Sequence, residues 1–230
     1  MSSSEPTDAP ERRSDDDRAH DSSLSDESIV SLDPEKPFWD RFYMVAPLVV
    51  IGTKDEETGV YDLAPKHMAT PMGWRNYYGF VCTPRHKTYR NAKHAGTFTV
   101  SFPRPDQLVL ASLAASPRSE EGNPSDGPGT KPSLDQLPTM PADVIDGVVL
   151  KDAYLYLECE IEQIVDNLGE NSLLIGRVAA VHAHRDILRT TEQDEQAAIR
   201  EHPLLAYLPP DRYATIDDTN AFPFPAGFEK

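Results

Sequence analysis

The sequence predicts a mainly β domain, an antiparallel barrel with a few short helices. Three observations support this prediction: the strand-like runs are short, turn residues separate them into hairpin-like pairs, and helical patterns are few and brief. With 230 residues, the chain is long enough for one domain with a sizeable hydrophobic core. We therefore expect one barrel domain and no internal repeat.

The first 36 residues are expected to be a disordered acidic tail. Residues 1–40 hold 12 acidic and 4 basic side chains, and almost no apolar residue precedes Leu24. Such a segment buries too little apolar surface to offset the conformational entropy that ordering costs. The ordered domain is therefore predicted to cover 37–230.

The composition excludes several classes of function. The net charge of −16 argues against nucleic acid and anionic membrane surfaces as partners. No apolar run approaches the roughly 18–20 residues that span a bilayer, and no signal peptide is recognisable. Cys82 and Cys159 have no metal-ligand spacing and are expected to be reduced. A cytoplasmic protein is predicted.

Each element of the first half follows from a local pattern. A continuous apolar run predicts a buried strand, Asp55–Gly59 is typical of a turn, and alternating apolar and hydroxyl side chains predict a further strand. In chain order, we expect a hairpin over 45–63 that begins with a strand over 45–51, a strand over 80–83, a helix over 89–94 ended by Gly96, and a strand over 97–102.

The second half is richer in strands and contains a long proline-rich segment. Residues 116–141 carry six prolines, which is too long a segment for a plain connector and predicts either a functional flap or an insertion. The other expected elements are a helix over 105–115, strands over 153–161 and 172–184 joined by a turn at Asn167 and Gly169, a helix over 192–201, and an extended tail over 203–228.

Two loops between these strands carry the chemistry. The second loop, Thr83–Asn91, offers hydroxyl, amide and cationic donors within nine positions, and these are the donors that a phosphate group binds. If a helix starts at Tyr89, Thr88 caps it and the phosphate gains the helix N-terminus. The alternative is a basic surface turn capped by Thr88. Together with the first loop, Lys66–Thr70, these donors suit a flat, phosphorylated cofactor such as a flavin.

The order of the motifs carries a family resemblance. The motifs are A-P-K-H-M at 64–68, T-P-R-H-K-T-Y-R-N at 83–91, G-T-F-T-V-S-F at 96–102, L-E-C-E-I at 157–161 and I-G-R-V-A-A-V-H-A-H from residue 175. In this order they resemble the flavin reductase-like (flavoredoxin-type) proteins of the FMN-binding split-barrel family, over about 37–215. The resemblance implies a six-stranded antiparallel split barrel, a homodimer, and FMN bound non-covalently near the dimer interface.

The resemblance also implies roles for the two loops. The first loop would lie along the flavin ring, with Lys66 facing the N1–C2 edge, where a reduced flavin gathers negative charge. Many relatives carry Ser or Thr where this chain has His67 or Met68, and a solvated lysine is the alternative interpretation of Lys66. The second loop would bind the phosphate. The candidate cofactor-binding residues are Lys66, His67, Met68, Ala69, Thr70, Thr83, Arg85, His86, Lys87, Thr88, Asn91 and His182.

His182 allows more than one interpretation. His182 and His184 would face the same way on a strand, and with His67 or His86 they would in principle hold a metal. No carboxylate or cysteine at ligand spacing supports such a site, so no metal is expected. A histidine pointing toward the flavin and a half-buried strand histidine are the other two interpretations.

These observations predict an FMN-dependent oxidoreductase of the flavin reductase type. It would move a hydride or electrons from a small-molecule donor such as NADH or NADPH, through FMN, to a small-molecule acceptor, with no obligatory acid or base side chain. The sequence has no Rossmann fingerprint, so a nicotinamide would bind only transiently. The alternatives are a non-catalytic FMN-binding or electron-transfer protein and a dimeric scaffold that has lost its flavin.

Overall fold

The computed structural model describes residues 28–116, 135–189 and 194–227, and it divides into two compact units after Phe38. In the first unit, residues 28–38 contain only turns, one of them closed by the Lys36 N–H, which donates to the Asp33 carbonyl at 3.2 Å. Residues 1–27 of the predicted acidic tail lie outside the described residues. The β-sheet and the helices all lie in the second unit, which begins at Trp39.

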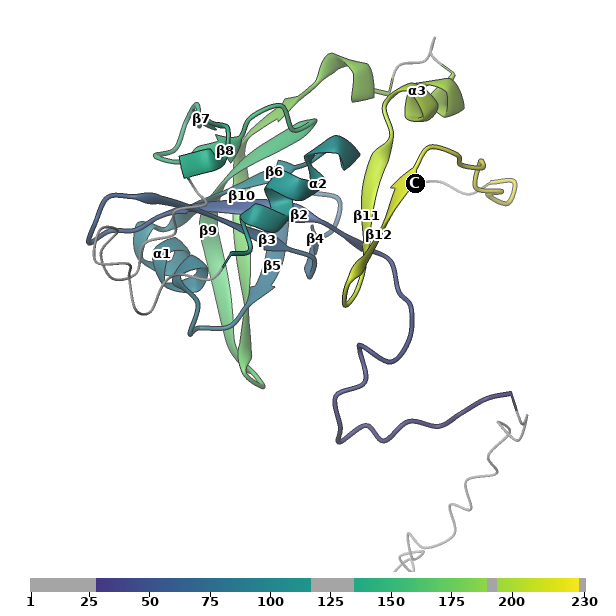
Figure 1. Cartoon of the computed structure of the whole chain (residues 1–230), viewed down its shortest axis with the longest axis horizontal. Helices are drawn as coiled ribbons and strands as arrows, with labels where there is room; N and C mark the ends of the chain where they lie inside the picture. The colour runs from purple at the N-terminus through teal and green to yellow at the C-terminus, as the bar shows by residue number, and fades with distance from the viewer. Residues whose placement is uncertain (1–27, 117–134, 190–193, 228–230) are drawn as a thin grey trace, which may run out of the picture. The chain divides into compact units, whose positions relative to one another are not determined.

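The second unit is built on one antiparallel sheet of seven strands (Figure 1), in the order β3-β2-β6-β9-β10-β5-β4. Six of the strands have six or more residues, and β4 adds a short edge strand. The mainly β, antiparallel prediction is therefore confirmed. The strands are β2 (Val49–Lys54), β3 (Tyr61–Lys66), β4 (Ala69–Pro71), β5 (Tyr77–Cys82), β6 (Thr97–Phe102), β9 (Leu155–Leu168) and β10 (Asn171–Ala183).

The sheet must curl because its two edge strands are neighbours in the chain. β3 and β4 stand at opposite ends of the strand order, yet only His67 and Met68 separate them. Seven strands laid flat would put the two edges roughly 28 Å apart, whereas two residues bridge roughly 10 Å. The sheet therefore rolls into a barrel. Within the described chain no ladder joins β3 to β4, so the barrel is split at this point.

Helix α1 (Lys87–Ala95) leaves β5 and packs against β2. It ends as predicted at Gly96, whose φ of 69° lies in the left-handed region and whose N–H donates to the Ala92 carbonyl at 2.9 Å. The prediction that Thr88 caps this helix is wrong. The helix begins two residues earlier, at Lys87, with His86 at its N-cap position, so Thr88 lies inside the first turn with its side chain buried.

The short helix α2 (Leu108–Leu113) continues from a 3-10 turn, η1 (Pro105–Gln107), as the helix-compatible run predicts. Its small residues Ala111 and Ala114 are fully buried against the sheet, in the smaller of two apolar clusters. The larger cluster fills the barrel interior and includes Phe80, Phe98 and Leu174. No helix among the described residues is long and apolar enough to cross a membrane.

The hydroxyl face of β6 is buried as well as its apolar face. The short hairpin of β7 (Thr139–Pro141) and β8 (Val148–Leu150) covers it. The Thr99 hydroxyl donates to the Val148 carbonyl at 2.6 Å, and the Leu150 N–H donates to Ser101 Oγ at 2.9 Å. β7 therefore shortens the loop predicted for 116–141, of which 117–134 lie outside the described residues.

The C-terminal part departs most from the prediction. The turn at Asn167 and Gly169, with φ of 65° and 64°, joins β9 to β10 as expected, and the pair projects beyond the sheet (Figure 1). After it come η3 (Arg185–Ile187) and α3 (Glu195–Glu201). The extended tail predicted for 203–228 is wrong for its first half. These residues form the hairpin β11 (Leu204–Leu208) and β12 (Arg212–Ile216), because β1 (Ala46–Pro47) offers β11 a free edge.

One buried carboxylate holds the β7–β8 hairpin on the barrel. Glu158 in β9 is 1 % exposed and accepts hydrogen bonds from the N–H groups of Asp143, Val144 and Ile145 at 2.7, 2.8 and 3.0 Å. Burial opposes the charged form, but the three N–H donors outweigh it and keep the pKa of Glu158 below its usual value.

We predict that Glu158→Gln lowers the free energy of unfolding by about 2 kcal/mol at pH 7, because the charge-assisted hydrogen bonds are weakened. A carboxyl whose pKa is depressed by folding stabilises above its unfolded pKa, near 4.3, and loses this effect as the pH falls through the folded pKa. The difference between wild type and variant in urea unfolding should therefore shrink below about pH 4.

Glu160→Gln is the matched control, since Glu160 lies on the same strand and forms only an exposed ion pair with Arg177. We expect it to change stability by less than about 0.5 kcal/mol. A Glu158→Gln protein as stable as this control at pH 7 would contradict the role given to Glu158.

Candidate functional site

The two loops predicted separately lie side by side. The first crosses from β3 to β4 at the split in the barrel, and β4 pairs with β5 so that Ala69 lies opposite Phe80. The Val81 N–H also donates to the Met68 carbonyl at 2.8 Å. Because β5 leads directly into the second loop, the fold brings Lys66–Thr70 beside the start of Thr83–Asn91.

Lys66 is the point where the two loops meet. Its ammonium group acts on titratable groups from both of them. Burial and then Lys66 lower the pKa of His67 in the first loop. Desolvation, Lys66 and Arg85 lower the pKa of His86 in the second loop. Burial raises the pKa of the Cys82 thiol at the end of β5, and Lys66 partly offsets this effect. One cation therefore lies between both candidate loops.

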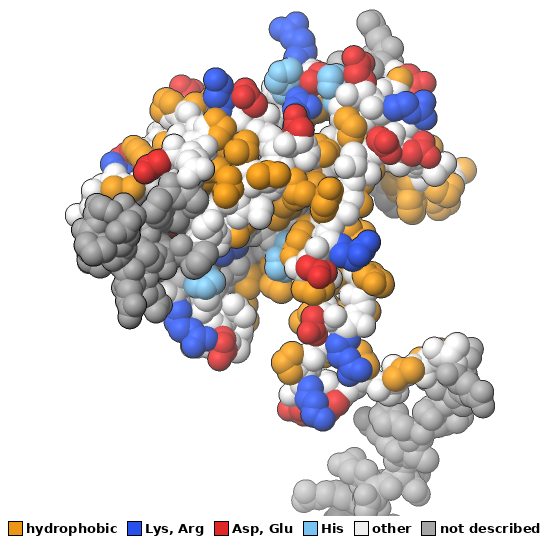
Figure 2. All heavy atoms as spheres, viewed as in Figure 1, with side chains coloured by type: hydrophobic (Ala, Val, Ile, Leu, Met, Phe, Trp, Pro, Cys, Tyr) orange, Lys and Arg blue, Asp and Glu red, His pale blue; other side chains and the backbone are white. Residues whose placement is uncertain are grey.

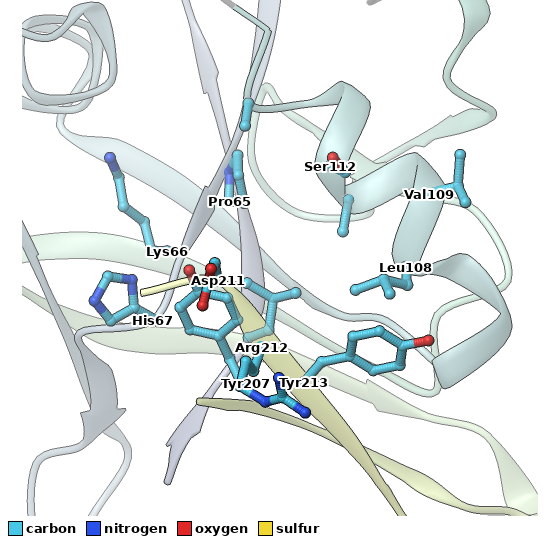
Figure 3. Close-up of a pocket in the computed structure, with 13 residues that line it drawn as sticks. Pro65, Lys66, His67, Leu108, Val109, Ser112, Tyr207, Asp211, Arg212 and Tyr213 are labelled. Atoms are coloured by element: carbon cyan, nitrogen blue, oxygen red, sulfur yellow. The ribbon is translucent and has the colours of Figure 1, made fainter. Parts of the chain in front are cut away.

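Lys66 and His67 also line a pocket of about 510 Å³ (Figure 3). Three parts of the chain form its walls: the end of β3 with the first loop, helix α2, and the β11–β12 hairpin. Figure 2 shows hydrophobic side chains gathered on this face of the molecule. The lining residues are Leu48, Pro65, Lys66, His67, Leu108, Val109, Ala111, Ser112, Ala115, Tyr207, Asp211, Arg212 and Tyr213.

Aromatic rings form one side of the pocket. The rings of His67 and Tyr207 face each other at 5.2 Å between centroids and are tilted by 45° (Figure 3). The Tyr207 hydroxyl donates to the Pro210 carbonyl, which ties the ring to its own turn. Since the pKa of His67 is lowered, its imidazole is neutral at pH 7. The pocket therefore offers flat, uncharged surfaces for a ring system.

Two cations from different elements reach the same pocket. Lys66 comes from β3 and Arg212 from β12, and Asp211 is the acidic residue in the lining. No ion pair holds Arg212 among the described residues. In a chain with a net charge of −16, this local balance favours an anionic or electron-rich ligand.

The second loop is less free to bind an anion than its composition suggests. The Lys87 ammonium forms a part-buried ion pair with Asp55, which lies in the β2–β3 turn. Arg85 pairs with Glu170 at 2.5 Å on the surface. Thr88 and Asn91 face inward, and the Asn91 amide donates to Thr53 Oγ1 at 3.3 Å. Of these four residues of the second loop, two are therefore paired with acidic residues and two are buried within the fold.

The start of α1 still has the features of an anion site. The N-cap residue His86 makes no side-chain hydrogen bond to this helix, whose first turn follows Thr83, Arg85 and His86. The Thr83 carbonyl accepts the His86 N–H at 3.0 Å and so shapes the turn. Free N–H groups and the positive end of a helix bind phosphate, and Arg85, His86 and Lys66 surround this end.

The remaining predicted residues divide between the site and other parts of the barrel. Met68 and Thr70 are exposed beside the pocket, whereas Ala69 is buried against β5. His182 lies elsewhere, near the far end of β10 from Ser172, the residue that pairs with Cys82. Its Nε2 lies 3.3 Å from Glu158. Within one chain, the fold does not bring His182 to the two loops.

The sequence did not predict that α2 and the β11–β12 hairpin form two walls of the pocket. The apolar run L-L-A-Y-L and the strand-favouring residues of R-Y-A-T-I, on either side of Pro209–Asp211, would have signalled a hairpin. No local pattern, however, tells that this hairpin faces the first loop. Three or more metal-ligating side chains do not gather anywhere in the described parts of the chain.

Comparison with known proteins places this fold and site in a family. The flavin reductase like domain model matches residues 41–213, so the chain belongs to the flavin reductase-like family. Both the family resemblance and the split-barrel fold predicted from the sequence are thereby supported. No curated protein matches the chain.

Solved structures show the same fold at low sequence identity. Flavoredoxin from Methanosarcina acetivorans is 16 % identical, with a TM-score of 0.66 over 86 % of this chain and 97 % of that one. An FMN-binding protein from Thermus thermophilus, solved with p-hydroxybenzaldehyde, is 20 % identical, with a TM-score of 0.63 over 85 % and 98 %. A Shewanella frigidimarina protein described with a split barrel domain is 16 % identical, with a TM-score of 0.65 over 79 % and 87 %. The split barrel is therefore confirmed.

We predict that Lys66→Met raises the pKa values of both His67 and His86, because removing a nearby positive charge favours protonation of each imidazole. The measurement is a pH titration of the histidine ring signals by NMR, with single His67→Gln and His86→Gln variants to assign them. Lys54→Met, which removes a lysine paired with Asp146 at the other end of the β2–β3 hairpin, is the control and should leave both pKa values unchanged. A shift of His67 alone would show that the two loops do not meet at Lys66.

Proposed function

We propose that this protein is an FMN-dependent oxidoreductase of the flavin reductase type. One observation carries the proposal: Lys66 both lines the ring-sized pocket and lies beside the uncapped start of α1. A flat ring system and a phosphate could therefore be held at two ends of one continuous surface. Membership of the flavin reductase-like family supports the same assignment.

The residues present fit FMN. Pro65, His67 and Tyr207 offer apolar and aromatic surface for the ring, along the first loop as the sequence predicts. At the other end, the first-turn N–H groups of α1, Arg85 and His86 would hold the phosphate. Lys87 would contribute only through the field it shares with Asp55, because the two are paired. The expected phosphate contacts therefore centre on Arg85 and the helix end.

A bound FMN would supply the redox chemistry, by accepting a hydride or electrons and passing them on. Lys66 would stabilise negative charge on the reduced ring, and its position between the loops suits this role. The neutral His67 would leave the pocket without a second charge at that wall. The open pocket gives a small-molecule donor, such as NADH or NADPH, and an acceptor a common route to the ring.

Two further expectations belong to the proposal. A homodimer follows from the family resemblance, and exposed side chains beside the first loop, Met68 and Trp74, offer apolar surface for a second chain. A cytoplasmic location follows from the reduced cysteines and the acidic composition.

We predict that the purified protein binds FMN more tightly than riboflavin, and that Arg85→Met weakens FMN binding about tenfold while riboflavin binding stays unchanged. The phosphate is the only difference between the two ligands, so the comparison isolates its site. Dissociation constants would come from quenching of flavin fluorescence. The control is Arg177→Met, which removes an arginine of β10 that is also exposed and ion-paired. It should leave both constants unchanged.

Anaerobic mixing of the FMN-loaded protein with NADH or NADPH tests turnover. Bleaching of the flavin absorbance by either nucleotide supports the reductase. FMN bound but reduced by neither nucleotide would leave a non-catalytic FMN-binding or electron-transfer protein as the better account. A protein that takes up no FMN would overturn the proposal and favour a scaffold that has lost its flavin.

A further inference from the structure

A second polar cluster lies outside the candidate pocket and is centred on Asp186 in η3. Arg104 Nη2 donates to both carboxylate oxygens, at 3.1 Å each. Nδ1 of His184 lies 2.6 Å from one oxygen, and Nδ1 of His202 lies 3.0 Å from the other. Burial opposes the charged form of Asp186, but these partners outweigh it and hold the pKa of Asp186 below its usual value.

Arg104 is the residue from which one wall of the pocket starts. It directly precedes η1 and α2, and its backbone N–H donates to Gln107 Oε1 at 3.1 Å. The Gln107 amide in turn donates to the Lys151 carbonyl at 2.7 Å. α2 then supplies apolar pocket surface through Leu108 and Val109. The guanidinium of Arg104 therefore fixes the start of this wall to Asp186.

His202 is the residue from which the opposite wall starts. It ends α3, where its N–H donates to the Ala198 carbonyl at 2.9 Å, and only Pro203 separates it from β11. The β11–β12 hairpin then supplies Tyr207, Arg212 and Tyr213 to the pocket. In Figure 3, Tyr213 of this hairpin and Leu108 of α2 lie across from each other.

The apolar contacts of the two walls lie beyond these starting points, within α2 and at Leu205 and Ala206 of β11. α2 packs into an apolar cluster through Leu110, Ala111 and Leu113, whereas α3 has no buried residue. β11 is held further along, where Ala206 and Tyr207 pair with β1. At Arg104 and His202, the positions of the two walls are therefore set largely by the polar contacts of Asp186.

The Asp186 cluster is also better shielded than the other arginine ion pairs. The side chains of Arg104 and Asp186 are 19 % and 18 % exposed, whereas those of Arg177 and Glu160 are both 49 % exposed. A part-buried pair with charge-assisted hydrogen bonds stabilises more than an exposed pair, which contributes little.

We propose that Asp186 is a positioning residue for the candidate pocket: one carboxylate ties Arg104 and His202 together and so sets the separation between α2 and the β11–β12 hairpin. This proposal rests on the proposed function, because the separation of the walls affects how tightly the pocket binds its ligand. Asp186 itself does not line that pocket.

The test compares Asp186→Asn with wild type by hydrogen exchange and by FMN titration. We expect faster exchange in both walls, over 108–113 and 204–216, and an FMN dissociation constant raised about tenfold. Asp218→Asn is the matched control, because Asp218 pairs at 3.6 Å with Arg200 of α3 on the exposed surface. It should change neither readout. Asp186→Glu should restore part of the affinity, since it keeps the charge.

Three outcomes decide the matter. Faster exchange in both walls together with weaker FMN binding supports the proposal. Exchange that changes only around η3, with FMN affinity within twofold of wild type, overturns it. If wild type binds no FMN, the proposed function fails, and the exchange of the two walls still tests the positioning role. Arg104→Lys, which keeps the charge but replaces the guanidinium that reaches Asp186, is the milder variant if Asp186→Asn does not fold.

Discussion

The two-residue link between β3 and β4 is the constraint on which the rest of this structure depends. It joins the opposite edges of a seven-stranded sheet, so the sheet has to roll up until those edges meet. The same link places Lys66 and His67 at the split, where β3 pairs with β2 on one side and, among the described residues, with no strand on the other. The candidate site therefore lies where the barrel has to open, and the chemistry of those residues is a consequence of topology.

Acidic residues shape this site as much as the cations do. The β2–β3 turn sends Asp55 to Lys87, and Glu170 in the β9–β10 turn pairs with Arg85. A loop that looks strongly basic in sequence is therefore partly neutralised in the fold. An incoming phosphate would compete with Glu170 for Arg85, whereas Lys66 forms no ion pair with an acidic residue in the described parts of the chain. The candidate pocket, which contains Lys66 and Arg212, is therefore more favourable for an anionic ligand than the second loop.

Two carboxylates, the buried Glu158 and the largely buried Asp186, hold segments of the chain in place at different points of the barrel. Glu158 collects three backbone N–H groups and holds the β7–β8 hairpin, while Asp186 collects an arginine and two histidines where β6, β10 and β11 approach one another. Each carboxylate fastens a peripheral segment to the barrel through polar contacts. In an acidic protein, such residues let the negative charge contribute to structure and not only to repulsion.

Local signals in the sequence determined the strands and turns of the barrel. The β2–β3 hairpin, the end of α1 at Gly96, β6 and the β9–β10 pair were all predictable, because alternation and turn residues act over a few positions. The fold also follows from the order of these elements, which is why the family resemblance was visible.

Only the tertiary structure decided which of the candidate residues meet. Lys66 lies beside His86 and Cys82 because β4 pairs with β5, and His182 is directed to Glu158 because β9 pairs with β10 at that position. The β11–β12 hairpin became a pocket wall because β1 offered it an edge. Each of these outcomes depends on pairing between segments far apart in the chain. A pattern read along the sequence contains no information on which distant strand becomes a neighbour.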